Sequence, residues 1–343
     1  MLRLDTDWQH RGLQVVRLEN DLLCIDVLPE LGAKIYNFVH KPSGRNLLWH
    51  NPTQPPARTH YGAAFDDNWS GGWDELLPND LPRPAEALLA KPWPGGDLLP
   101  DHGEFWSQAA EWEVVTASPT RLEVRFTSYG RVLATRFEKT LCLEVGAPFA
   151  RLQYTYHNMG AVPIDFLWNI HPPLSISADS WLDVPACEGI ADPWREAQFQ
   201  GNQRFEWPFI RDRQGQIVDL REVKPAGSGI ADLHYLVDVE QGWYAVTDRG
   251  ARVGFALSFP TAVFPHVWLF RTFGGWRGLY TLILEASTGY PYDLDVARQN
   301  GTCAHLGAGE TLTAEALAIA YAGIAAVSRV EADGAVVPGR PQT

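Results

Sequence analysis

Four segments of alternating apolar and polar residues follow one another in the second quarter of the chain, and they constrain the fold more than any other feature. They cover residues 112–115, 121–126, 134–143 and 150–156, and short turns such as 118–120 separate them. Side chains of a strand point alternately to the two faces of a sheet. The pattern therefore predicts an antiparallel meander with one buried and one solvated face.

Turn-forming residues are spread over the whole length of the chain. The 343 residues include 30 Gly and 25 Pro, and 12% of them are aromatic. Short runs of Val, Thr, Tyr, Phe and Trp between such turns are typical of many short strands. We see no repeat and no linker, so we expect an all-β protein with a single large antiparallel sandwich over residues 1–330. The Gly- and Pro-containing tail, 331–343, is expected to fray.

The net charge of the protein limits the kinds of molecule that it is expected to bind. The formal net charge is −13, which argues against nucleic acid or an anionic membrane surface and favours a neutral or weakly charged small molecule. The first ten residues contain no apolar core of a signal peptide, and no apolar run approaches the length needed to span a membrane. We therefore expect a cytoplasmic protein. Its oligomeric state is left open.

The cysteines indicate neither a metal site nor a disulfide framework. Cys24, Cys142, Cys187 and Cys303 are far apart and show no Cys-x-x-Cys or Cys/His spacing. Ordinary buried thiols account for them. We expect no metal.

One carboxylate stands inside an apolar run. Residues 282–284 are Leu-Ile-Leu, Glu285 follows, and a Thr-Gly-x-Pro turn begins at residue 288. A buried carboxylate is disfavoured unless it is paired or used chemically, and burial raises its proton affinity. Glu285 is therefore a candidate catalytic base. The alternative is a structural Glu that binds loop amides or pairs with an Arg.

A histidine ends another apolar run. Residues 164–170 read as a buried strand that leads to His171 and then to Pro172 and Pro173, where the sheet ladder is expected to stop. Imidazole titrates near neutral pH, so a rigidly held His171 is a candidate general acid. The alternative is a histidine that bonds to the neighbourhood of Asn169.

Residues 66–80 have no period and mix acids, amides, Trp and Gly, as binding loops commonly do. Aromatic faces and amide or carboxylate oxygens suit sugar hydroxyls. The candidate substrate-binding residues are Trp73, Asp74 and Asn79 in this loop, His102 in the polar aromatic segment after it, and Trp268 in the strand-like run before Glu285. The alternative is a loop of ordinary turn formers that its tryptophans pin down.

Taken together, a set of short motifs resembles the aldose 1-epimerase (galactose mutarotase-like) family, in order and over nearly the whole chain. The motifs are Gly-Ala-Lys-Ile at 32–35 with Leu-Trp at 48–49, His-Gly at 102–103, Trp-Asn-Ile-His-Pro at 168–172, Leu-Glu at 284–285 and Leu-Gly-Ala-Gly-Glu at 306–310.

The resemblance implies a β-supersandwich with the sugar in a groove on one sheet, and interconversion of α and β anomers without a cofactor. It implies that Glu285 takes the proton of the anomeric hydroxyl while His171 gives one to the ring oxygen, and that His102 contacts the sugar. The ring opens, the C1–C2 bond turns, and closure on the other face reverses both proton transfers. A carboxylate and an imidazole suffice, because no leaving group is expelled.

The chain departs from the family in two places. The family has an Arg in the first groove loop, whereas residues 73–80 contain no basic residue and the next one is Arg83. The Asp that holds sugar hydroxyls has no secure match, and Asp232 or His234 is proposed for that role. No basic cluster is present for a phosphate group, so a phosphorylated hexose is disfavoured. The identity of the sugar stays open.

Two functions remain after this reading. The first is a mutarotase that acts on a free sugar, and the second is a carbohydrate-binding protein on the same fold that does no chemistry. An enzyme acting on polysaccharides is a weaker third, because the chain shows no paired Asp/Glu motif of a glycosidase.

Overall fold

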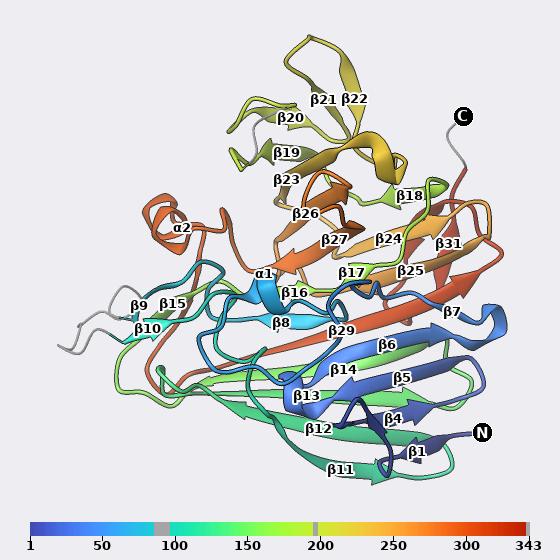
Figure 1. The fold of residues 1–343 in the computed structure, drawn as a ribbon, viewed down its shortest axis with the longest axis vertical. Coiled ribbons are helices and arrows are strands. Elements are labelled where there is room, and N and C mark those ends of the chain that lie inside the picture. The colour runs from blue at the N-terminus through green and yellow to red at the C-terminus, as the bar shows by residue number, and fades with distance from the viewer. Residues whose placement is uncertain (86–96, 195–197, 341–343) are drawn as a thin grey trace.

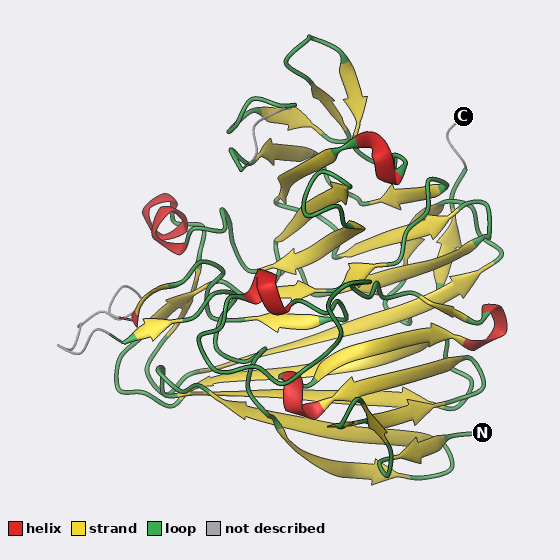
Figure 2. Ribbon diagram, in the orientation of Figure 1, coloured by secondary structure: helices red, strands yellow, loops and turns green. Residues whose placement is uncertain are grey.

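The computed structural model describes residues 1–85, 97–194 and 198–340. Strands dominate these residues, and the helices are few and short (Figure 2). Every named strand pair is antiparallel, so the predicted all-β fold class is confirmed. Within the described ranges, no helix has the length and apolar character needed to cross a bilayer.

An eight-stranded sheet, the long sheet, begins with the predicted meander. Leu122, Val124 and Phe126 are buried on one face while the residues between them stay partly exposed, as the alternation predicts. The order of its strands is β11 (Glu111–Ala117), β12 (Arg121–Tyr129), β13 (Thr135–Glu144), β14 (Phe149–Asn158), β29 (Thr311–Ala322), β25 (Val253–Ser258), β24 (Trp243–Asp248) and β18 (Ser180–Asp183).

A second sheet, the site sheet, carries the central candidate residues. In order, its strands are β20 (Arg204–Glu206), β19 (Glu188–Ala191), β23 (Ile230–Val237), β26 (His266–Phe273), β27 (Tyr280–Ser287), β16 (Asn169–His171) and β8 (Asp74–Leu76), and β17 (Pro173–Leu174) also pairs with β27. Strands β23, β26, β27, β16 and β8 are nearly all buried because both faces are covered, whereas the edge strand β20 is mostly exposed.

A third sheet has five strands and continues the layer of the site sheet. Isolated bridges from Ile35 to Trp73 and from Leu48 to Leu174 join the two, and in Figure 1 β6 runs close to β8. Its order is β1 (Arg3–Asp5), β4 (Val16–Glu19), β5 (Leu23–Leu28), β6 (Lys34–His40) and β7 (Arg45–Asn46).

Hairpins and single turns make up the rest of the described secondary structure. The two-stranded sheets are β2 (Gln9–His10) with β3 (Leu13–Gln14), β9 (Arg83–Pro84) with β10 (Leu98–Leu99), β15 (Ile164–Phe166) with β28 (Ala304–Leu306), β21 (Phe209–Arg211) with β22 (Ile217–Asp219), and β30 (Val327–Val330) with β31 (Val336–Pro338). The helices are α1 (Phe65–Asn68) and α2 (Leu294–Asn300), with 3₁₀ turns η1 (Pro29–Leu31), η2 (Lys41–Ser43) and η4 (Ala226–Ser228).

Part of the C-terminal tail forms regular structure. Residues 336–338 form β31, and Val336 packs against the cluster that contains Val327 and Val330. Residues 341–343, the end of the segment expected to fray, lie outside the described residues.

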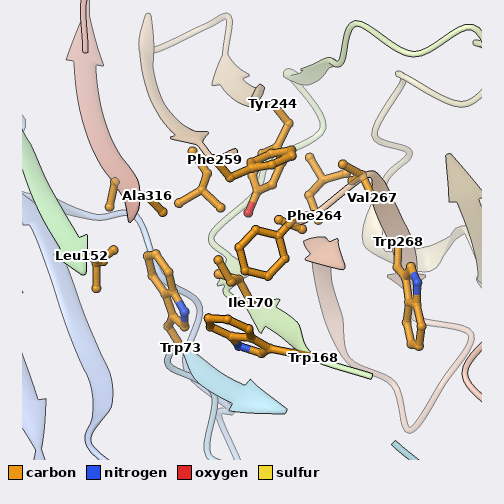
Figure 3. Packing of buried hydrophobic residues seen from close by; sticks show 14 of the residues in the cluster. Trp73, Leu152, Trp168, Ile170, Tyr244, Phe259, Phe264, Val267, Trp268 and Ala316 are labelled. Carbon is orange, nitrogen blue, oxygen red and sulfur yellow. The ribbon is translucent and has the colours of Figure 1, made fainter. Parts of the chain in front are cut away.

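Aromatic side chains fill the space between the layers. Trp168 lies edge-on to Tyr154 of the long sheet at a centroid distance of 5.1 Å, and 4.8 Å from Phe264. Figure 3 shows Trp73, Trp168 and Phe264 gathered in this core while Trp268 stands apart from them. One hydrophobic cluster takes residues from all three large sheets. The site sheet is thereby held rigid from behind, so its other face can carry a precisely built cavity.

Candidate active site

A row of three side chains crosses the face of the site sheet that lines the cavity. Trp268 on β26 pairs directly with Glu285 on β27. On the other side of β27, Ile170 pairs with Ala286 and Pro173 with Ile283, which places His171 opposite Glu285. Side chains directly opposite one another in a sheet share a face. The register alone therefore brings together the predicted base Glu285, the predicted acid His171 and the predicted substrate-binding residue Trp268.

The expectation that the sheet ladder stops at the two prolines after His171 is wrong. The chain runs on, and β17 keeps the register that β16 began against β27. The proline φ suits an extended strand, and what Pro172 lacks is an N–H donor. The result is a local gap in the hydrogen bonding beside Glu285, with the strand direction unchanged.

These side chains form the floor of a cavity of about 220 Å³. Trp194, Trp276 and Tyr292 come from loops at the ends of strands, and Phe65, Asp66 and Trp69 come from α1 and the residue after it. The described lining is Phe65, Asp66, Trp69, Leu76, Asp80, Leu81, Asp101, His102, His171, Trp194, Leu233, Trp268, Phe270, Trp276, Ile283, Glu285 and Tyr292.

Glu285 is 4% exposed, and its Oε2 atom has no hydrogen-bond partner among the described residues. Burial raises the pKa of its carboxyl well above the usual range, the nearby Asp80 raises the pKa further, and His102 and a hydrogen bond from Asn169 oppose these effects. Asn169 is itself held by Ser287, whose hydroxyl donates to the Asn169 Oδ1 at 2.5 Å. Glu285 is thus a buried carboxyl group at a cavity with only one of its two oxygens, Oε2, lacking a partner among the described residues, an environment of many general acids and bases.

His171 is equally buried, and in the part of the chain that the structure describes its Nδ1 has no hydrogen-bond partner. Its ring meets Phe65 and Trp69 edge-on at centroid distances of 5.8 and 5.9 Å. Burial lowers the pKa of His171 well below its usual value, and the positive charges of His102 and Lys34 lower it further. In the free site His171 is therefore a neutral imidazole.

His102 is the third sequence-predicted residue that lines the cavity. Its ring stacks on Phe65 at 4.0 Å and stands edge-on to His171 at 6.3 Å. The Asp101 Oδ1 lies 2.8 Å from its Nδ1, and the Asp80 Oδ1 lies 3.8 Å from its Nε2. Burial alone would lower the pKa of His102, but Asp80 and Asp101 raise it to about 9. His102 is a cation at neutral pH.

The three predicted binding residues of the 66–80 loop, Trp73, Asp74 and Asn79, lie outside the described cavity lining. The Trp73 indole donates to Glu75 at 3.1 Å inside the core. The Asp74 carboxylate accepts a hydrogen bond from Lys34 Nζ at 2.5 Å, with both groups buried. The Asn79 amide donates to the carbonyls of Leu81 and Pro100 at 2.8 Å. These polar groups are used to hold the loop in place.

Asp232 and His234 also lie outside the lining, on the opposite face of β23. Leu233 between them lines the cavity, and successive strand residues face opposite sides. Asp232 forms a bidentate ion pair with Arg271, with N–O distances of 2.7 and 2.8 Å. The ring of His234 lies 5.3 and 5.7 Å from those of Phe199 and Phe205.

Several lining residues were not singled out from the sequence. Asp66, Trp69 and Asp80 belong to the loop recognised as a binding loop, but nothing local distinguishes them from their neighbours. Asp101 directly precedes His102 in the sequence, and an acid next to a candidate histidine is a signal from which Asp101 could have been predicted as a site residue. In the described ranges, no cluster of three or more His, Cys, Asp or Glu side chains suited to a metal ion is found.

Comparison with known proteins places the fold. No family model and no curated protein matches the sequence. A candidate aldose 1-epimerase from Klebsiella pneumoniae has a TM-score of 0.71 at 13% identity, over 93% of this chain and 83% of that one. A galactose mutarotase-like protein from Clostridium acetobutylicum has a TM-score of 0.66 at 11% identity, over 94% and 99%.

A protein from Synechocystis sp. PCC 6803 gives a TM-score of 0.64 at 17% identity, over 92% of this chain and 97% of that one. Likeness at such low identity concerns the arrangement of the strands, and function has to be argued from the site. The chain thus has the galactose mutarotase-like fold, and its resemblance to the aldose 1-epimerase family is confirmed at the level of the fold.

Proposed function

We propose that the protein is an aldose 1-epimerase, a cofactor-independent isomerase that interconverts the α and β anomers of a free sugar. The observation that carries the proposal is the convergence of Glu285, His171 and His102 on one aromatic-lined cavity. The three lie on separate segments of the chain and line the same cavity, and Glu285 Oε2 and His171 Nδ1 have no hydrogen-bond partner within the described ranges. Ring opening of a sugar needs such a set, one base and one acid.

The ring-opening step follows from these groups. The Glu285 carboxylate takes the proton of the anomeric hydroxyl, the C1–O5 bond breaks as the C1 carbonyl forms, and the ring oxygen receives a proton from a histidine. The resemblance assigns the donor to His171. Rotation about C1–C2 and reversal of both transfers give the other anomer. Because burial favours the neutral form of Glu285, the rate is expected to rise with pH as this carboxyl ionises.

The lining favours a sugar without an anionic group. Seven of the described lining residues are Phe, Trp or Tyr, and none is Lys or Arg. Aromatic faces pack against the C–H faces of sugar rings, whereas a phosphate or carboxylate needs cationic partners. His102 already has two carboxylates beside it. We propose an uncharged hexose or pentose as the substrate class.

Anomer equilibration of a panel of uncharged sugars, followed by polarimetry or NMR, tests this function. Glu285→Gln is expected to reduce the acceleration over buffer by about 10²–10⁴-fold, the usual contribution of a general base, while the protein still folds. Glu188→Gln is the matched control, because Glu188 pairs with Arg204 on the surface. Full activity in Glu285→Gln would rule out the proposed mechanism.

A carbohydrate-binding protein without turnover is the second candidate. It is favoured by the neutral forms that burial imposes on both Glu285 and His171 in the free site. It predicts sugar binding by calorimetry together with an equilibration rate equal to that of buffer. The same sugar panel separates the two functions.

A further inference from the structure

We propose that the substrate is a 6-deoxyhexose or a pentose, a sugar whose C5 carries a methyl group or no carbon substituent, and that an apolar half of the cavity selects it. The inference rests on the proposed ring-opening function and narrows its substrate class. The apolar half consists of Ile283, Phe270 and Leu233 on the site sheet and of Trp69 and Trp276, which pack beside them.

The register of the site sheet places the apolar half on one side of Glu285. Ile283 comes two residues before Glu285 on β27, so both side chains face the cavity. Phe270 pairs with Ile283, and Leu233 pairs with Phe270. These three side chains therefore form a row parallel to the row that contains Glu285, one step toward the start of β27.

The hydrogen-bonding groups of the cavity are attached on the other side of Glu285. Asn169 pairs with the second residue after Glu285 on β27, and on its other side it pairs with Leu76 of β8. The residue after Leu76 forms a bridge with Gly103. The loop of residues 101–103 is thus attached at the end of the site sheet that is opposite the apolar row.

This polar half suits the hydroxyls on C2, C3 and C4 of a sugar. Asp80, Asp101 and His102 line the cavity there. His102 Nε2 lies 3.8 Å from Asp80 Oδ1, too far for a direct hydrogen bond, so both groups keep hydrogen-bonding capacity for hydroxyls. The remaining aspartate of the lining, Asp66, is 42% exposed and lies 4.0 Å from Arg277, so it stands where the cavity opens to solvent.

The apolar half offers no side-chain acceptor among the described lining residues. Ile, Leu and Phe have no polar side-chain atom, and the indole N–H of a Trp donates a hydrogen bond but accepts none. A hydroxyl buried there leaves its own proton without a partner, which weakens binding. A methyl group or a ring C–H buried at the same place is stabilised by its removal from water.

The proposed chemistry determines which end of the sugar meets the apolar half. Glu285 acts on O1 and His171 on O5, and C5 is bonded to O5, so C5 lies beside His171. The Trp69 ring stands edge-on to that of His171 at 5.9 Å and lies 6.0 Å from that of Trp276. A methyl group on C5 therefore enters the apolar half while the hydroxyls on C2 to C4 turn toward the polar half.

The test compares sugars that differ only at C6. The pairs are D-fucose with D-galactose, L-fucose with L-galactose, L-rhamnose with L-mannose and D-quinovose with D-glucose, and D-xylose is the pentose counterpart of D-glucose. Anomer equilibration is followed by polarimetry or NMR, with the buffer rate subtracted. For the ring configuration that the site accepts, we expect kcat/KM of the sugar without the 6-hydroxyl to be about 10–100-fold higher, the discrimination that an apolar pocket achieves against an added hydroxyl.

Two substitutions at Ile283 test whether the apolar half is responsible. Ile283→Thr introduces a hydroxyl that can accept and donate, and Ile283→Val is the matched control, because Val has nearly the shape of Thr and no hydroxyl. We expect the preference for the deoxy sugar to be about 3–10-fold smaller in the Thr variant than in the Val variant, the effect of one hydrogen bond. If Ile283→Thr does not fold, Phe270→Tyr is compared with the wild type in the same way.

The outcomes separate this inference from the proposed function. If the protein accelerates equilibration but handles the 6-hydroxyl sugar as well as or better than its partner in every pair, the inference is overturned and the function stands. A deoxy preference that is equal in Ile283→Thr and Ile283→Val also overturns it, because another part of the site then selects the sugar. A wild type no faster than buffer for every sugar overturns the function and the inference together.

Discussion

At the scale of single residues, buried ion pairs decide which acids are available to a ligand. Asp232 is 5% exposed and Arg271 1% exposed, and two hydrogen bonds join them. Burial alone would raise the pKa of Asp232, but Arg271 and His234 lower it far below its usual value. The carboxylate is committed to this pair and is structural.

Asp232→Asn is therefore expected to lower the free energy of unfolding by about 3–5 kcal/mol at pH 7, because it leaves Arg271 buried without its partner charge. The folded pKa lies below that of the unfolded chain, so the contribution is present above about pH 4 and is lost as the pH falls further. Urea denaturation at pH 7 and pH 3 measures both effects. Asp5→Asn, at an exposed pair with Arg3, should leave the stability almost unchanged, because solvent screens such pairs. An equal loss in both variants would contradict the assignment.

At the scale of elements, the turn between β9–β10 and the long sheet positions His102. Gly103 has a φ of +83°, and a Cβ on it would lie 2.1 Å from the Leu77 carbonyl oxygen. The close approach is part of the structure, because the Glu104 amide donates to that same oxygen at 2.9 Å. Only glycine fits this combination of backbone conformation and contact.

Gly103→Ala should displace the loop and with it His102. We expect the anomerisation rate to fall at least tenfold, since small errors in placing a catalytic group are costly. Gly146→Ala is the control, because Gly146 has a φ of +71° with nothing within 4 Å of its added Cβ, and it should cost only about 1–2 kcal/mol of backbone strain. Equal activity in the two variants would show that the loop tolerates displacement.

At the scale of the whole molecule, a buried polar group joins the two layers. Glu75 of β8 accepts hydrogen bonds from Tyr154 of the long sheet at 2.9 Å and from Trp168 at 3.2 Å, and Lys139 Nζ lies 3.6 Å away. Burial raises the pKa of Glu75 and lowers that of Lys139, each against the pull of the other's charge. The network fixes the site sheet against the long sheet from behind.

Lys139→Met leaves Glu75 without its countercharge and is expected to destabilise the fold by about 3–5 kcal/mol. Chemical denaturation at neutral pH measures this loss. Lys224→Met, at a half-exposed pair with Glu222, should be close to neutral. A Lys139→Met protein as stable as the wild type would mean that the hydrogen bonds to Glu75 are enough to stabilise its buried carboxyl group without the charge of Lys139.

A structural feature could be predicted from the sequence when it depends on residues that are close together in the chain. The alternation in residues 121–126 depends on neighbours two positions apart, so the strands and their buried face could be predicted. The fold class, and the choice of Glu285 and His171 as candidates, came from equally local runs and motifs. By itself the sequence determined the strand-rich architecture, the acidic character of the protein and a short list of chemically able residues.

Tertiary structure alone decided which of those residues meet. A strand's side chains change face with every residue, so the placement of Leu233 in the cavity puts Asp232 and His234 on the other face, and no local pattern sets that choice. The Asp74 carboxylate binds Lys34, forty positions away in the sequence, and is therefore not part of the cavity lining. Asp80 and Asp101 come together around His102 because β9 and β10, which lie between them in the chain, pair in the antiparallel sense. Contacts between distant segments depend on register and packing, and these are properties of the assembled sheets.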